Sequence, residues 1–141
     1  MDDVMRRVSP FERLALAVLR ITIGFLFMQH GVQKLFGWLG GEAVALLSIR
    51  GVAGILETFG GALILLGAWT RPVALVLLAE MLVAYFWRHA PRGFWPIENG
   101  GEPAALYAVV FLYLTARGGG GFGIDGLRWR RSRSRRRRGR G

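Results

Sequence analysis

Four long apolar segments occupy most of the chain, at residues 14–36, 52–69, 72–87 and 103–116. A helix needs about 20 residues to cross the hydrocarbon core of a bilayer, and about 17 to 25 are tolerated. The first two segments meet this length, and the last two reach it when charged residues at their ends extend toward the headgroups. Helices that are apolar on every face are not expected in a soluble bundle. The sequence therefore predicts an all-α fold, a transmembrane four-helix bundle.

Positive charge is concentrated at the end of the chain. The sequence has 19 Lys plus Arg against 9 Asp plus Glu, although 52% of its residues are hydrophobic. Nine of the arginines lie in the last fourteen residues, a segment too charged to bury a core and therefore predicted to be disordered. The domains we expect are a cytoplasmic N-terminal segment (1–13), a transmembrane domain (14–127) and a disordered Arg-rich cytoplasmic tail (128–141).

The basic residues between the apolar segments predict the orientation in the membrane. Four crossings put both termini on one side, and that side carries more arginines than the side that holds Arg50, Arg88 and Arg92. Because cytoplasmic loops are enriched in Lys and Arg, we expect a multi-pass protein of the inner or plasma membrane with both termini in the cytoplasm. The tail is expected to contact anionic lipid, and no nucleic acid is expected as a partner. Arg20 interrupts the first apolar segment, so a cleaved signal peptide is not predicted.

Several classes of site are disfavoured by the residues present. The chain contains no cysteine, which excludes disulfides, thiolate metal sites and thiol redox chemistry by this chain. No metal is expected, because the histidines and glutamates lie on four separate helices and show no Glu-x-x-His spacing. The sequence also has no G-x-S-x-G nucleophile motif.

Ionisable residues of all four segments are expected at one level near the outer leaflet. His30 and Lys34 end the first segment and Glu57 lies inside the second, so Lys34 and Glu57 are candidates for an ion pair. His89 ends the third segment and Glu102 opens the fourth. Histidine side chains titrate near neutral pH and can carry protons. This cluster predicts either a site that binds a ligand or handles protons, or a purely structural polar network.

Two further expectations concern helix packing. Gly24 and Gly31 share a helix face with Lys34, and Gly54 and Gly61 share one with Glu57, a pattern that predicts a close seam between the first two helices.

Depth along the helices suggests a second pair. At 1.5 Å per residue, Arg20 lies roughly 9 Å from Leu14, and Glu80 lies roughly 12 Å from Pro72 on the same side of the membrane. We therefore predict that Arg20 and Glu80 form a structural ion pair.

Three stretches together resemble the DoxX family of small four-helix membrane proteins. They are LRITIGFLFMQHGVQKLFG, ILETFGGALILLGAWTRPVALVLLAEMLVAYFWRH and NGGEPAALYAVVFLYLTARGGGGFGID. The resemblance covers about residues 14–126 and leaves the tail outside. The polar positions that it implies are Arg20, His30, Lys34, Glu57, Arg71, Glu80 and Glu102.

The resemblance implies work in membrane redox chemistry, since related proteins resemble the quinone-reducing subunit of a thiosulfate oxidoreductase. It suggests a subunit that binds a quinone-like or small oxidised molecule, with His30, Lys34 and Glu57 as catalytic candidates: His30 would pass protons and Lys34 would stabilise an anionic oxygen. Ligand-binding candidates are Gln33, Glu57, His89 and Glu102. No intrinsic cofactor is expected, so any oxidoreductase activity would depend on a redox-protein partner or a quinone. The alternatives are a non-catalytic assembly or scaffold protein and, third, a small-solute transporter.

Overall fold

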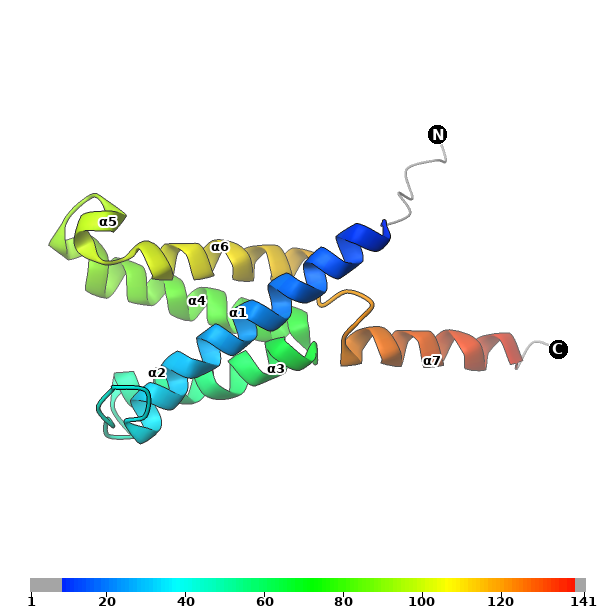
Figure 1. The fold of residues 1–141 in the computed structure, drawn as a ribbon, viewed down its shortest axis with the longest axis horizontal. Helices are drawn as coiled ribbons and strands as arrows, with labels where there is room; N and C mark the ends of the chain where they lie inside the picture. Colours follow the sequence, from blue (N-terminus) through cyan, green and yellow to red (C-terminus); the bar gives the residue numbers. More distant parts are fainter. Residues whose placement is uncertain (1–8, 139–141) are drawn as a thin grey trace.

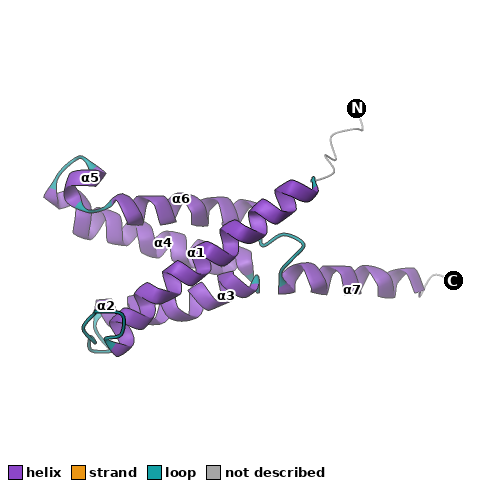
Figure 2. Cartoon of the chain, viewed as in Figure 1, coloured by secondary structure: helices purple, strands orange, loops and turns teal. Residues whose placement is uncertain are grey.

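The computed structural model describes residues 9–138, and all regular secondary structure in this range is helical (Figure 2). The all-α prediction is therefore confirmed. In chain order the elements are α1 (Pro10–Phe36), α2 (Ile49–Ile55), η1 (Leu56–Gly60), α3 (Gly61–Leu66), α4 (Thr70–Ala84), η2 (Tyr85–His89), η3 (Ala90–Arg92), α5 (Pro96–Asn99), α6 (Glu102–Arg117) and α7 (Ile124–Arg138).

Capping residues set the limits of α1. Ser9 and Glu12 form a reciprocal capping box, in which each side chain accepts a hydrogen bond from the other residue's backbone N–H, at 2.8 and 3.0 Å. The helix ends where Gly37 takes a left-handed conformation with φ 66°. These caps start α1 four residues before the apolar segment begins, and its 27 residues span about 40 Å.

The second long helix is continuous through α2, η1 and α3, and its central part is a π-helix. Ser48 caps its start by accepting from the backbone N–H of Gly51 at 3.0 Å, and Gly67, at φ 66°, ends it. The start at Ile49 is three residues earlier than the apolar pattern predicted. The wider turns of η1 therefore lie in the middle of this helix.

The long helices form two antiparallel hairpins. In one hairpin α1 packs along α2, η1 and α3, and in the other α4 packs along α6. Figure 1 shows the hairpins diverging toward the end where α2 and α5 lie. The start of α1, the α3–α4 turn and the end of α6 lie at the opposite end.

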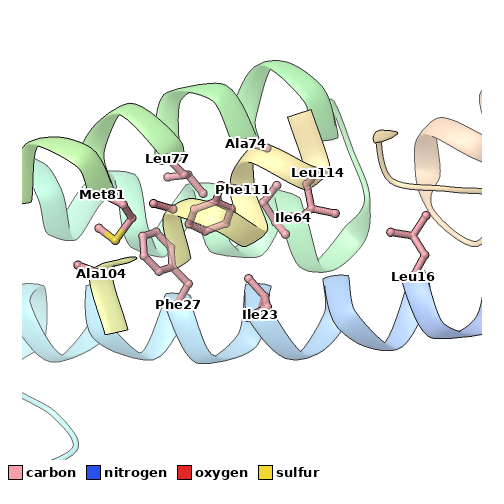
Figure 3. Close-up of a cluster of buried hydrophobic side chains, with 11 residues drawn as sticks. Leu16, Ile23, Phe27, Ile64, Ala74, Leu77, Met81, Ala104, Phe111 and Leu114 are labelled. Atoms are coloured by element: carbon pink, nitrogen blue, oxygen red, sulfur yellow. The ribbon is translucent and has the colours of Figure 1, made fainter. Parts of the chain in front are cut away.

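Apolar side chains from both hairpins form one core (Figure 3). Phe27 of α1 and Phe111 of α6 meet edge to face with ring centroids 4.9 Å apart, and both are buried. Ile64 and Leu77 complete the contact from α3 and α4. Burial of these side chains holds the hairpins together, because each aromatic or branched side chain removed from solvent or lipid gains close packing.

The outer surface of the bundle is also apolar. Leu75, Val76, Leu82 and Val83 of α4 are exposed, as are Leu106 and Val109 of α6. Within the described residues, the helical stretches 49–66 and 70–92 are long and apolar enough to cross a membrane. A continuous apolar exterior is what a bilayer requires of a protein surface.

The Arg-rich segment differs from its prediction, because α7 is helical as far as Arg138. Its start is attached to the bundle: the backbone N–H of Asp125 donates to the Gly67 carbonyl at 2.9 Å, and the Asp125 carboxylate accepts from the backbone N–H groups of Trp69 and Thr70, both at 2.9 Å. Asp125 thus fixes the first turn of α7, and arginine has a high helix propensity. The prediction of disorder was wrong over 128–138. Residues 139–141 and residues 1–8 lie outside the described residues.

Candidate functional site

The seam between α1 and the second long helix is built from glycines. A Cβ added to Gly24 would lie 2.7 Å from the Gly61 carbonyl oxygen, and one added to Gly31 would lie 2.6 Å from the Gly54 carbonyl oxygen. Real Cβ atoms do not approach oxygen this closely, so the two backbones touch only because these positions lack side chains. The predicted seam is confirmed, and it brings the polar ends of the two helices together.

An ion pair crosses this seam. The Nζ of Lys34 donates to Oε1 of Glu57 at 2.5 Å. Glu57 is 3% exposed and lies in the π-helical segment η1, a distortion that often occurs at functional sites. Its second carboxylate oxygen, Oε2, is buried and has no hydrogen-bond partner. The pairing expected for Lys34 and Glu57 is confirmed, and the pair retains an unused acceptor.

The pair lies deeper than expected. Glu57 is eight residues after Ile49 and nine before Leu66, which places it near the middle of the second long helix, about 12 Å from its start. The sequence placed it closer to the helix end because the apolar pattern missed the first turn, which Ser48 caps.

Glu80 belongs to this cluster rather than to Arg20. It approaches from α4 and is close enough to Lys34 and Glu57 to interact electrostatically with both. Both oxygens of its carboxylate are buried and have no hydrogen-bond partner. Three ionisable side chains, two acidic and one basic, therefore lie in one region, where α4 packs against η1.

The predicted ion pair between Arg20 and Glu80 is wrong. The guanidinium of Arg20 donates instead to three backbone carbonyls, those of Ile64 at 2.7 Å, of Leu65, and of Phe122 at 3.3 Å. Two of these carbonyls lie in the last turn of α3, where carbonyls lack the usual i+4 partner. The two terminal nitrogens of Arg20 therefore have backbone acceptors without a carboxylate, while its Nε is buried without a hydrogen-bond partner.

An aromatic edge lies beside the ion pair. The exposed ring of His30 meets Tyr107 of α6 edge to face, with centroids 6.0 Å apart, and Tyr107 also contacts Phe27 at 5.0 Å. His30 and Tyr107 each interact electrostatically with Glu57. One residue from each hairpin thus borders the pair.

The other predicted ligand-binding residues lie elsewhere. The side-chain amide of Gln33 donates to the Leu39 carbonyl at 3.1 Å, in the loop after α1. The Nδ1 of His89 lies 3.1 Å from the Asn99 carbonyl oxygen, beside α5. Glu102 is exposed at the start of α6. Because α5 and α2 lie at separate corners of the molecule (Figure 1), His89 and Glu102 are not brought to the ion pair.

Sequence reasoning assigned no role to two residues. Tyr107 was overlooked because an aromatic residue within an apolar segment has no distinguishing pattern. Asp125 follows the glycine-rich connection after α6, and its side chain caps α4 from a distance of more than fifty positions in the chain. Its place at the end of the stretch GFGID, which resembles the DoxX family, is the sequence signal that marks it.

The arrangement places hydrogen-bond donors and acceptors side by side. Lys34 has N–H groups beyond the one that Glu57 accepts, and Glu57 and Glu80 offer unused carboxylate oxygens. Tyr107 and His30 place two aromatic rings beside this pair. Within residues 9–138 no three His, Asp or Glu side chains are grouped so that they could hold a metal ion.

Comparison with known proteins gives two findings. Residues 15–90 match the family model described as DoxX. An uncharacterized protein from Haemophilus influenzae (strain ATCC 51907 / DSM 11121 / KW20 / Rd) is 38% identical over 128 residues, which cover 86% of this chain and 96% of that relative. No solved structure matches the chain.

Proposed function

The chain belongs to the DoxX family and is an integral membrane protein, and from this premise we propose that it is a redox-associated membrane subunit that binds a quinone-like or similar small oxidised molecule. The observation that carries the proposal is the half-satisfied ion pair between Lys34 and Glu57. A buried carboxylate with an unused oxygen, 3% exposed, is costly to maintain unless something binds to it. Ionisable groups that are buried within a membrane protein usually have a functional role.

Each residue of the site has a role in this proposal. Lys34 donates a hydrogen bond to a carbonyl oxygen of the bound molecule and stabilises negative charge that develops there. His30, which is exposed beside Tyr107, accepts or releases the accompanying proton. A quinone supplies electron-accepting chemistry when bound. The electrons come from a partner redox protein, since the chain has no cysteine for thiol exchange.

The two histidines of the chain offer a matched test. The protein purified in detergent should contain an extractable quinone or bind an added short-chain benzoquinone. His30→Phe should weaken quinone binding by about 10-fold, because phenylalanine keeps a ring beside Tyr107 but cannot form the hydrogen bond through which His30 exchanges a proton with the quinone oxygen, while the melting temperature stays the same. His89→Phe, away from the ion pair, should leave quinone binding unchanged.

Two results would count against the proposal. A protein that neither retains nor binds any quinone would favour the assembly or scaffold alternative. Equal losses of affinity in the two histidine variants would show that the His30 effect is not specific to the site.

We also propose a multi-pass topology with both termini in the cytoplasm. Leu47 and Phe94 are exposed in the loops at the diverging end, and Arg128 is exposed in α7. Single cysteines at positions 47 and 94 should react with an impermeant thiol reagent in intact cells, whereas Arg128→Cys should react only after permeabilisation. Contact of the Arg-rich segment with anionic lipid, worth about 1 kcal/mol per arginine, would support this orientation. If residues 128–141 are deleted, the cysteines at positions 47 and 94 should be labelled only in part in intact cells, because the chain would insert in both orientations. In the full-length chain, labelling of position 128 in intact cells would overturn the topology.

A further inference from the structure

We propose that Glu80 is a neutral carboxylic acid inside the bundle and that it donates a hydrogen bond to an oxygen of the molecule bound at the Lys34–Glu57 pair. The first half of this inference concerns the protein alone. The second half rests on the proposed function.

The charges at the site are unbalanced. The positive charge of Lys34 is matched by Glu57, to which it is bound at 2.5 Å, and the carboxylate of Glu80 is then left over. Its charged neighbours are Glu57 from η1 and Lys34 from α1. His30 and Tyr107 interact with Glu57. A second negative charge here would face Glu57 with no cation of its own.

Hydrogen bonding gives the same conclusion independently. An ionised carboxylate in an apolar interior needs donors for its oxygens, and both oxygens of Glu80 are buried without one. Binding a proton removes the charge and turns one oxygen into a donor. Protonation of Glu80 lowers the free-energy cost of its burial. It also leaves a single ionised carboxylate, that of Glu57, to pair with Lys34.

The neutral acid also completes the ligand site. Lys34 and a protonated Glu80 are donors that approach from different hairpins, α1 and α4, and both are close to Glu57. A carbonyl oxygen between them can accept from both sides, as a quinone-like molecule would. The unused Oε2 of Glu57 remains available as an acceptor for a hydroxyl group.

Infrared spectroscopy of the ligand-free protein tests the first half. A protonated carboxyl group has a C=O stretching band that an ionised carboxylate lacks. The wild-type protein in detergent at neutral pH should show this band, and Glu80→Gln should lose it. Glu102→Gln is the matched control, because Glu102 is exposed, and it should leave the band intact. Absence of the band in the wild type, or its persistence in Glu80→Gln, would overturn the neutral state of Glu80.

Titration with a short-chain benzoquinone tests the second half. Glu80→Gln keeps a neutral side chain with an N–H donor and should bind the quinone within about 3-fold of the wild type, whereas Glu80→Leu should bind it about 10-fold more weakly. Equal binding by Glu80→Leu and the wild type would overturn the hydrogen bond. Failure of the wild type to bind the quinone would overturn the proposed function and this second half together, while the infrared band would still decide the state of Glu80.

Discussion

Replacing Lys34 with methionine is expected to lower the free energy of unfolding by about 3–5 kcal/mol, because it leaves the carboxylate of Glu57 buried without its cation. Glu57 is 3% exposed, and Lys34 supplies its hydrogen bond at 2.5 Å. Methionine has nearly the length of the lysine stem, so packing against the seam is retained. Thermal or denaturant unfolding in detergent, followed by circular dichroism, measures the loss.

The double variant Lys34→Met/Glu57→Leu decides whether the loss comes from the unpaired charge. Removing both members of a buried ion pair is often neutral for stability, so the double variant should recover most of what Lys34→Met loses. Arg50→Met serves as the control, since Arg50 is exposed and its replacement should change stability by no more than about 0.5 kcal/mol. A double variant no more stable than the sum of the single losses would show that the two residues are not coupled.

Replacing Gly61 with valine is expected to cost about 3 kcal/mol or more and to separate the helices of the first hairpin. A Cβ at this position would lie 2.7 Å from the backbone nitrogen of Met28 and 2.8 Å from the Gly24 carbonyl oxygen. These neighbours are backbone atoms of α1 and cannot rotate away. The Lys34–Glu57 pair lies on the same seam, so quinone binding should be lost together with stability.

Gly121 provides the matched control for the seam. The nearest atom to a Cβ at Gly121 is a terminal nitrogen of Arg130, 3.6 Å away, which is an ordinary contact with a flexible side chain. Gly121→Val should therefore melt close to the wild type. If Gly61→Val and Gly121→Val were equally stable, the close approach of α1 and α3 would not be a determinant of the fold.

Much of the site follows from helical periodicity. Gly24, Gly31 and Lys34 fall on one face of α1, and the partners of this face, Gly54 and Glu57, recur at similar spacing on the second helix. Small residues next to an ionisable one can be recognised in the sequence as a seam, because a polar group in lipid needs both space and a partner. This pattern was sufficient to predict the Lys34–Glu57 pair.

The Arg20–Glu80 prediction failed because residue patterns do not show which backbone carbonyls are free to accept a hydrogen bond. It assumed that a buried guanidinium requires a carboxylate, whereas the terminal nitrogens of Arg20 donate to main-chain carbonyls of α3 and of the segment before α7. Every residue has such a carbonyl, and whether it is free depends on where a helix ends and what packs over it. Because Glu80 was assigned to Arg20, the sequence did not predict that both of its carboxylate oxygens lack a hydrogen-bond partner.

The sequence by itself determined that the chain forms apolar helices, where most of them lie, and which faces carry glycine and charge, because these properties depend on neighbours within a few turns. Only the tertiary structure decided which polar residues meet. The divergence of the two hairpins keeps His89 and Glu102 away from Glu57, and the packing of α4 against η1 brings Glu80 toward it. The contact of Asp125 with the start of α4 likewise orders the first turn of α7. Crossing angles and contacts between distant segments arise from packing of the whole bundle, which no local pattern encodes.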